Sequence, residues 1–455
     1  MLQFFWMDSK MILLLLIGLA VSIRGETDLK SLIPQQVHLS LSDKPNEVVI
    51  TWSTMEKTAD SFVEFGLTLP GLELQHGNMT YFEECGKKGC RSQYIHRVRL
   101  SNLTYGASYM YHVGSSDGGW SPVFSFKTPP SPPALEGGDS AAQWAPRILV
   151  LGDMGTLNAK SLPYLQEEVM HQSADGILHV GDFAYDMDWE SGALGDEFMR
   201  QIEPIAAYVP YMTCPGNHEE KRNFSEYRAR FSMPGPYESL MHSFDMGMVH
   251  FIALSTEFYY FLEYGIKLPV MQFEWLVEDL KKATTAEARA ARPWIVAFGH
   301  RPMYCSNGGP ADCNHYSSRV RTGIPFLGLL GLENLFYEYG VDLLLWGHQH
   351  SYERLWPVYN HEVKNGSIEE PYRNPGAPVH IITGSAGCWE GKSPFVLPAP
   401  EWSAFRSTDF GYTRLLFQNV SHLLVEQVSV DKGGQVIDSF WIMKDEHRAY
   451  EYSVI

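Results

Sequence analysis

Short apolar stretches that alternate with polar residues fill the first part of the chain. Between about residues 37 and 126 they include EVVITWST, HRVRLSNL, SYMYHVGS and SPVFSFKT, with Gly, Pro, Asn and Asp in the segments between them. A period of two places alternate side chains on one face of a strand, and turn residues end each strand. The pattern therefore predicts short strands that pack as an all-β sandwich.

The predicted β-domain covers residues 26–130. Trp52 and the later pair Tyr109 and Tyr111 resemble the arrangement in fibronectin type III domains, and no cluster suited to catalysis stands out among its residues. Residues 131–146 are rich in Pro, Gly, Ser and Ala, a composition typical of a linker. A second domain is expected after it, because a chain of 455 residues exceeds the roughly 250 residues that one core accommodates.

From residue 147 the pattern changes to strands that alternate with helices. RILVLGD, GILHVGD, WIVAFGH and VDLLLWGH are apolar runs of strand length. Apolar residues at helical spacing lie between them: Leu162, Leu165 and Val169; Phe273, Leu276, Val277 and Leu280; Leu332, Leu335, Phe336 and Tyr339. This rhythm predicts an α/β domain at residues 147–455, with layered sheets flanked by helices and C-terminal β-hairpins that extend a sheet.

The net charge and the N-terminal residues limit the classes of binding partner and the cellular compartments that fit this protein. A formal net charge of -18 argues against nucleic acid and anionic membranes as partners, because both attract basic surfaces. Residues 1–25 read as a signal peptide, with Lys10 ahead of MILLLLIGLAVSI and small residues after it; a retained anchor is the alternative, although the run is short for a span of about 20 residues. We expect secretion, or delivery to a secretory or lysosomal lumen, and no membrane partner.

Sequons and cysteines fit an oxidising compartment. Five N-x-S/T triplets, which also occur by chance, begin at Asn78, Asn102, Asn223, Asn365 and Asn419 and are predicted glycosylation sites. Cys85 with Cys90, and Cys305 with Cys313, are close enough to close short loops. Cys214 and Cys388 have no obvious partner.

Five predicted strands in the second domain end in polar residues that can bind metal. They are followed by LGDMG with Asp153; VGDFAY with Asp182 and Tyr185; CPGNHE with Asn217 and His218; AFGH with His300; and GHQH with His348 and His350. Each motif alone is weak, since a single histidine at a strand end is usually structural. Because the carboxyl ends of adjacent strands in an open α/β sheet converge on one crevice, the five together predict a shared site.

This ordered set of motifs resembles the purple acid phosphatases of the metallophosphoesterase superfamily. The likeness covers nearly the whole mature chain: GDxG, GDxxY, GNH(E/D), a histidine after an apolar strand, and GHxH, together with the N-terminal sandwich and the C-terminal hairpins. One position departs from the family, which usually has Val three residues before the fourth motif's histidine. Here that residue is Ala297, and Val296 lies one position earlier.

The resemblance implies a dinuclear metal site. One metal would take Asp153, Tyr185, His350 and a shared Asp182, and the other would take Asp182, Asn217, His300 and His348. Carboxylates and a phenolate are hard anionic donors that suit Fe(III), whereas imidazole and amide donors suit a divalent ion. Zn, and alternatively Fe or Mn, all meet that description.

Two further histidines are predicted to act on the substrate side. His218 is not needed as a ligand, so it would contact phosphate or protonate the leaving group, unless it only begins a helix. His315, in DCNHYSS, lies where the family keeps further substrate-side histidines, but its spacing differs from that of the plant members.

The resemblance implies an acid phosphatase that hydrolyses small phosphate monoesters with a metal-activated hydroxide as nucleophile. Two alternatives stay open: a phosphodiesterase or nucleotide pyrophosphatase on the same metal core, and a non-catalytic binding protein in which the β-sandwich acts. Retention of all seven predicted ligands argues against a vestigial site. The oligomeric state is not indicated by the sequence.

Overall fold

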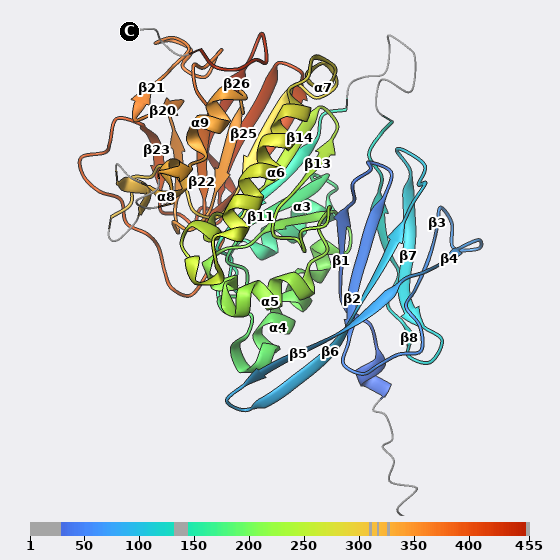
Figure 1. The fold of residues 1–455 in the computed structure, drawn as a ribbon. Coiled ribbons are helices and arrows are strands. Elements are labelled where there is room, and N and C mark those ends of the chain that lie inside the picture. The colour runs from blue at the N-terminus through green and yellow to red at the C-terminus, as the bar shows by residue number, and fades with distance from the viewer. Residues whose placement is uncertain (1–28, 132–143, 309–311, 316–317, 325–327, 452–455) are drawn as a thin grey trace, which may run out of the picture.

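The structure, a computed structural model, describes residues 29–131, 144–308, 312–315, 318–324 and 328–451. The predicted signal peptide at residues 1–25 and most of the predicted linker lie outside the described residues. Figure 1 shows a β-sandwich beside a larger α/β domain. Within the described ranges, no helix combines the length and the apolar character needed to cross a bilayer.

Two antiparallel sheets form the N-terminal domain. The first has the order β1-β2-β6-β5, with β1 at Gln35–Leu41, β2 at Val48–Thr54, β5 at Asn78–Gly86 and β6 at Gly89–Leu100. The second contains β3 at Phe62–Gly66, β4 at Glu73–His76, β7 at Ser108–Ser115, β8 at Gly119–Trp120 and β9 at Phe124–Lys127. Trp52 and Tyr111 are buried in the core between them, and this confirms the predicted sandwich.

The second domain is built on two larger sheets. The six-stranded sheet has the order β12-β11-β10-β24-β25-β26, with β10 at Arg147–Leu151, β11 at Gly176–Val180, β12 at Tyr211–Cys214, β24 at Gly411–Asn419, β25 at His422–Ser429 and β26 at Gln435–Met443. The seven-stranded sheet has the order β13-β14-β15-β18-β22-β19-β23, with β13 at His242–Met246, β14 at Val249–Ala253, β15 at Trp294–Phe298, β18 at Leu343–Trp346, β19 at Tyr352–Leu355, β22 at Val379–Thr383 and β23 at Ser403–Ser407. The predicted C-terminal hairpins therefore extend the six-stranded sheet.

Side chains alternate between the two faces of the central strands, so neighbouring residues of one strand pack into different cores. Val296 and Leu345 belong to a core that also contains Ile148 and Val150 of the other sheet. Their neighbours Ala297 and Leu344 lie in a second core, with residues of the helices that cover the outer face. The two sheets thus share one apolar layer and carry helices outside it (Figure 1).

The helices cover these sheets and connect their strands. They are α3 at Leu162–Met170, α4 at Trp189–Ala206, α5 at Lys221–Arg230, α6 at Lys267–Ala283, α7 at Ala286–Ala291, α8 at Arg319–Thr322 and α9 at Glu333–Glu338. The predicted helical spacing is confirmed for α3, α6 and α9. Gly340, with φ +63°, follows α9 at a position where a residue without Cβ is favoured. Short paired strands lie at Gly323–Ile324, Leu329–Leu330, Val358–Tyr359 and Glu362–Val363.

Both predicted disulfides are present, Cys85–Cys90 and Cys305–Cys313. The first closes the turn between β5 and β6, where Cys85 and Cys90 are cross-strand partners. The second closes a loop shortly after β15. Cys214 and Cys388 are free and buried.

Buried charges join the two domains. Asp196 of α4 is fully buried and contacts Arg91 (Nη2 to Oδ2 2.5 Å) and Gln93 (Nε2 to Oδ1 3.1 Å) of β6, and it also pairs with Arg230 of α5 (2.7 Å). Arg230 pairs in turn with Glu226 one helical turn earlier (2.7 Å). A strand of the sandwich and two helices of the second domain therefore meet on one carboxylate.

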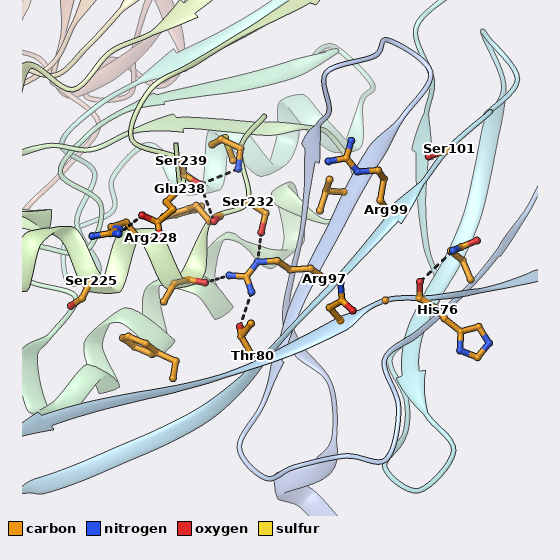
Figure 2. A pocket seen from close by; sticks show the side chains of 18 residues that line it. His76, Thr80, Arg97, Arg99, Ser101, Ser225, Arg228, Ser232, Glu238 and Ser239 are labelled. Atoms are coloured by element: carbon orange, nitrogen blue, oxygen red, sulfur yellow. Dashed lines mark hydrogen bonds and ion pairs between the residues drawn. The ribbon is translucent and has the colours of Figure 1, made fainter. Parts of the chain in front are cut away.

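A cavity of roughly 970 Å³ lies along the same junction (Figure 2). Arg97 of β6 reaches across it and donates to Ser232 Oγ (2.8 Å), to Thr80 Oγ1 (2.8 Å) and to the carbonyl of Ala229. Arg228, at its other wall, pairs with Glu238. The polar groups in this cavity hold the domains together, and none of its lining residues belongs to the strand-end cluster described below.

Removing the charge of Asp196 should weaken this junction. Burial raises the pKa of Asp196, but Arg230 and Arg91 outweigh it and hold the pKa below its ordinary value. The contribution to stability is therefore present above about pH 3.9 and lost as the pH falls below it. We expect Asp196→Asn to lower the free energy of unfolding by about 3 kcal/mol at pH 6, measured by urea denaturation.

Glu197→Gln is the matched control, because Glu197 is the next residue of α4 but is half-exposed and pairs only with Arg200 in the recorded ion pairs. It should change stability by less than about 0.5 kcal/mol. Equal denaturation midpoints for the Asp196 and Glu197 variants would show that the buried network does not stabilise the junction.

Candidate metal centre

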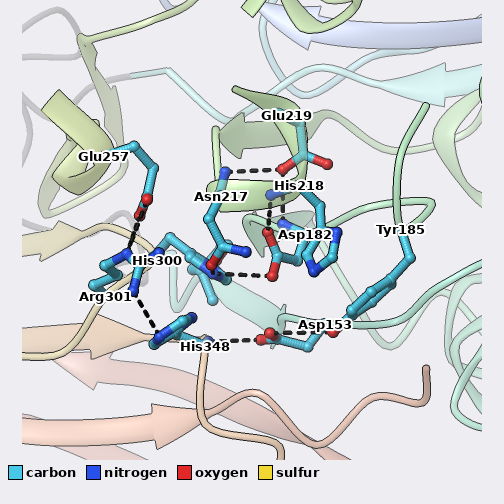
Figure 3. A network of polar contacts seen from close by, with 12 residues as sticks. Asp153, Asp182, Tyr185, Asn217, His218, Glu219, Glu257, His300, Arg301 and His348 are labelled. Carbon is cyan, nitrogen blue, oxygen red and sulfur yellow. Dashed lines mark hydrogen bonds and ion pairs between the residues drawn. The ribbon is translucent and has the colours of Figure 1, made fainter. Parts of the chain in front are cut away.

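The polar residues predicted at five strand ends converge on one place between the two sheets (Figure 3). β10, β11 and β12 are parallel neighbours in one sheet, and β15 and β18 are parallel neighbours in the other, so their carboxyl ends lie at the same edges. The residues that follow these strands are Asp153 after β10, Asp182 and Tyr185 after β11, Asn217 and His218 after β12, His300 after β15, and His348 and His350 after β18.

One group of donors contains Asp153, Tyr185 and His350. The phenol oxygen of Tyr185 lies 2.8 Å from His350 Nε2 and 3.4 Å from Asp153 Oδ1. His350 Nε2 is 3.4 Å from the same carboxylate oxygen. Its other ring nitrogen, Nδ1, lies 2.9 Å from the carbonyl of Gly391, which fixes the ring so that Nε2 faces the group.

The other group contains Asp182, Asn217, His300 and His348. His300 Nε2 lies 3.1 Å from Asp182 Oδ2 and 3.2 Å from Asn217 Oδ1, while its Nδ1 lies 2.9 Å from the carbonyl of Val180. Ligand atoms of Asp182, His300 and His348 all lie within 4.8 Å of one another, a spacing that could hold a metal ion. Asp182 lies at the centre of the network in Figure 3, between the two groups.

Four of these residues have strained backbone conformations. Asp153, Asp182, Tyr185 and His348 have φ angles of 58°, 53°, 60° and 67°. The left-handed region costs a non-glycine residue roughly 1–2 kcal/mol, so such residues persist only where the surrounding fold imposes them. Their concentration at one point indicates that the positions of these side chains matter more than local stability.

Glycines let the backbone approach the two carboxylates. A Cβ at Gly216 would lie 2.2 Å from Asp182 Oδ1, and Cβ atoms at Gly347 and Gly384 would each lie 2.6 Å from Asp153 Oδ2. No side chain fits at such distances. Any larger residue at these three positions would displace the carboxylates.

The two carboxylates are buried and draw positive charge toward themselves. Burial raises the pKa of Asp182, but the charge of His300 and hydrogen bonds lower it well below its ordinary value. Burial lowers the pKa of His300 and of His350, yet the carboxylates Asp182 and Asp153 outweigh it and raise these values to about 10 and about 11. A cluster of this kind needs cations, whether protons or metal ions.

The pKa of His348 shifts in the opposite direction. Burial and the nearby Arg301 lower the pKa of His348 well below its ordinary value, so this imidazole is neutral. Arg301 Nη1 donates to His348 Nε2 (2.9 Å), and its Nε donates to Glu257 Oε2 (2.9 Å). Neutral imidazole is the form that binds metal. Sequence reasoning gave no role to Arg301, although it directly follows His300.

Glu219, the last residue of the GNHE motif, holds the ligand loops in place. Its carboxylate accepts hydrogen bonds from the backbone amides of Asp182 (2.9 Å), Phe183 (3.0 Å) and Gly216 (2.9 Å). The loops after β11 and β12 are thereby tied to one side chain. Glu219 is visible in the motif, but the motif does not say where its side chain points, so its function could not be assigned from the sequence.

His218 lies at the edge of the cluster. Its backbone amide donates to Asp182 Oδ1 (3.0 Å), and its Nδ1 lies 2.9 Å from Asp186 Oδ1. Burial lowers the pKa of His218, but Asp186 and the other carboxylates nearby outweigh it and raise the value to about 9. His218 is thus a cation over the whole acidic range.

His315 lies apart from this arrangement in its recorded contacts. It follows the short helix at Asp312–Asn314, its side chain is exposed, and its backbone amide donates to the carbonyl of Asp312 (3.0 Å). In the described part of the chain, no recorded hydrogen bond, ion pair or ring contact joins it to the cluster. Its substrate-side role stays a prediction.

Comparison with known proteins gives the class of this site. Residues 146–352 match the family model described as Calcineurin-like phosphoesterase. Residues 34–128 match the N-terminal domain of purple acid phosphatases, and residues 377–439 match the C-terminal part of iron/zinc purple acid phosphatase-like proteins. The chain belongs to the purple acid phosphatase family.

Individual relatives agree with this assignment. The chain is 52% identical over 425 residues to acid phosphatase type 7 of Danio rerio, a match that covers 91% of this chain and 92% of the relative. It is 51% identical to the human protein of the same name, over 94% and 95% of the two chains. A purple acid phosphatase isolated from yellow lupin (Lupinus luteus) seeds has 26% identity and a TM-score of 0.73, over 91% of this chain and 75% of that one.

The donor set fits a pair of metal ions. Asp153, Tyr185 and His350 offer a carboxylate, a phenol and an imidazole within 3.4 Å of one another, and the second group offers an amide and two imidazoles around Asp182. These are the hard oxygen and the borderline nitrogen donors that iron and divalent transition metals prefer. Buried carboxylates without enough positive charge are themselves a reason for metal to bind.

Replacing Glu219 should loosen the metal site without touching a predicted ligand. Glu219→Gln turns an amide NH₂ toward backbone N–H groups, so at least one of the three hydrogen bonds is lost. We expect metal affinity to fall roughly 10- to 100-fold, as is typical for residues that support ligands, measured by competition with a chelator. Glu220→Gln, which alters a side chain directed to Lys221 and Tyr264, should retain normal affinity. Unchanged affinity in both variants would show that Glu219 does not organise the loops.

Proposed function

We propose that this protein is a secreted acid phosphatase that uses two metal ions to hydrolyse phosphate monoesters. The observation that carries this function is the convergence of two donor groups on a buried Asp182. Asp153, Tyr185 and His350, with Asp182, would bind Fe(III). Asn217, His300 and His348, with the same Asp182, would bind a divalent ion, for which Zn, Fe and Mn are candidates.

The chemistry needs the metal ions and one nearby acid. Two metal ions bound to these residues would orient the phosphate, lower the pKa of a water and neutralise charge on the transferring group. His218 supplies the proton for the leaving alcohol, because its Nδ1 is directed to Asp186 and its Nε2 is turned away from that carboxylate. Asp186 fixes the orientation of the ring and favours its charged form.

Two observations support an extracellular or luminal location. The two disulfides require an oxidising compartment. Asn78, Asn102 and Asn365 are exposed, as acceptors of N-linked glycans must be. Asn223 is a poorer acceptor, because its Oδ1 is buried, and Asn419 is partly buried with its Oδ1 accepting from Ser421. We infer a signal peptide at residues 1–25, a β-domain at 26–130, a linker at 131–146 and a catalytic domain at 147–455.

Loading the protein with iron and zinc tests the function and Tyr185 together. The loaded protein should hydrolyse 4-nitrophenyl phosphate in mild acid much faster than the bis-ester, and it should be coloured, because a phenolate bound to Fe(III) absorbs visible light by charge transfer. Tyr185→Phe should lose the visible band, recorded by absorption spectroscopy. A preference for the bis-ester would instead favour a phosphodiesterase, and a band that survives the substitution would exclude Tyr185 as the iron ligand.

Removing His218 should affect poor leaving groups most. Alkyl phosphates need a proton on the leaving oxygen, so His218→Ala should slow them roughly 10²- to 10⁴-fold, while nitrophenyl phosphate should slow much less. Metal content should stay normal, since His218 is not a proposed ligand. His171→Ala, at an exposed histidine after α3, is the control. Equal slowing of both substrates would assign His218 to phosphate binding rather than to proton transfer.

A further inference from the structure

Two carboxylates flank His218 on the side open to solvent. Asp186 Oδ1 lies 2.9 Å from His218 Nδ1, and Glu390 Oε1 lies 3.8 Å from His218 Nε2. Their side chains are 40% and 37% exposed, whereas Asp153 and Asp182 are buried. An incoming substrate can therefore contact Asp186 and Glu390, whereas the buried Asp153 and Asp182 would bind metal.

The nearby cations are paired with other acids. Lys221 lies 3.5 Å from Glu220, Lys392 lies 2.6 Å from Asp431, and Arg301 lies 2.9 Å from Glu257. Among the ion pairs of the described residues, Asp186 and Glu390 share His218 as their partner. The two carboxylates and one imidazolium of this group leave a net negative charge beside His218.

Glu390 lies beside the nitrogen of His218 that would protonate the leaving group. His218 Nδ1 is directed to Asp186, so Nε2 is the atom that can reach the ester oxygen, and Glu390 faces that same nitrogen. A substituent on the leaving alcohol would pass within reach of the Glu390 carboxylate. An anionic substituent is repelled there, and a cationic one is attracted.

Trp389 is an exposed aromatic residue that directly precedes Glu390. It lies between Glu390 and Cys388, whose Sγ is 3.4 Å from His350 Nδ1, so its backbone lies beside the site. Its side chain is 61% exposed, which is unusual for Trp. Trp faces attract ammonium groups, as carboxylates do.

We propose that Glu390, assisted by Asp186, selects phosphate monoesters whose alcohol carries a positive charge, namely small amino alcohol phosphates. The inference rests on the proposed phosphatase function and adds its substrate class. Because Glu390 Oε1 lies 3.8 Å from the nitrogen that would protonate the ester oxygen, an ammonium two carbons from that oxygen would come within reach of this carboxylate. Acidic phosphate esters, with a further anion on the alcohol, are disfavoured by the same charge.

Three monoesters of similar size test the charge preference on the metal-loaded protein: 2-aminoethyl phosphate, propyl phosphate and carboxymethyl phosphate. We expect kcat/KM to fall about tenfold at each step from cationic to neutral to anionic alcohol, as for a unit charge near a partly exposed carboxylate. Glu390→Gln should reduce the cationic-to-neutral ratio to below about threefold. Glu390→Lys should reverse the order. Glu369→Gln, at an exposed acid elsewhere, should keep the wild-type ratios.

A binding measurement separates recognition from chemistry. 2-Aminoethylphosphonate and propylphosphonate cannot be hydrolysed, and isothermal titration should give tighter binding of the first to the wild type and equal binding to Glu390→Gln. Equal wild-type kcat/KM for the cationic and neutral esters would overturn the proposal. So would a Glu390→Gln variant that slows all three esters by one factor, which would make Glu390 only a positioning residue for His218. Failure to hydrolyse even 4-nitrophenyl phosphate would instead reject the phosphatase function itself.

Discussion

Two buried carboxylates at the junction of two sheets govern the rest of this structure. Asp153 and Asp182 are almost completely removed from solvent, and a buried charge costs several kcal/mol unless positive charge and hydrogen bonds offset it. Two kinds of group offset the buried charge. His300 and His350 are drawn toward their cationic forms, and backbone amides donate hydrogen bonds to the carboxylates. In the functional protein, metal ions would supply most of the positive charge. The left-handed backbone at Asp153 and Asp182 and the glycines packed against them follow from burying two carboxylates among the ligand loops.

The convergence of the five strand-end motifs could be predicted from the sequence because it depends on a rule about sheets rather than on detailed packing, whereas the assignment of ligands to two metals came from the family resemblance and stays a prediction. Each candidate follows an apolar run of strand length, and parallel strands bring their carboxyl ends to one edge wherever the intervening helices lie. Periodicity of apolar residues predicted the sandwich, from the alternation around Trp52. It also predicted helix α6, from Leu276 and Leu280, which are both buried. In these elements the local pattern and the tertiary structure agree.

Residues that act through tertiary contacts could not be found in this way. Glu219 was visible in its motif, but its three amide partners come from two loops that approach each other only in the folded chain. Glu390 follows β22 in a segment without regular secondary structure, and no spacing in the sequence relates it to His218. His315 is an exposed histidine in a suggestive segment, and within the described residues no hydrogen bond, ion pair or ring contact joins it to the cluster. Motif spacing predicts which strand end a residue occupies, not which way a loop turns.

The β-sandwich contributes to the metal centre although none of its residues lies in it. Asn217 and His218 belong to the short helix at Asn217–Glu219, and α5 begins two residues later. The far end of α5 is fixed by the sandwich, because Arg230 shares Asp196 with Arg91, and the carbonyls of Ala229 and Arg230 lie against Arg97 and His38. α5 is not one continuous helix, because Arg222, Asn223 and Phe224 have left-handed φ angles of 52°, 56° and 62°. The sandwich therefore fixes the far end of the segment that follows Asn217 and restrains the ligand loop indirectly, across this break.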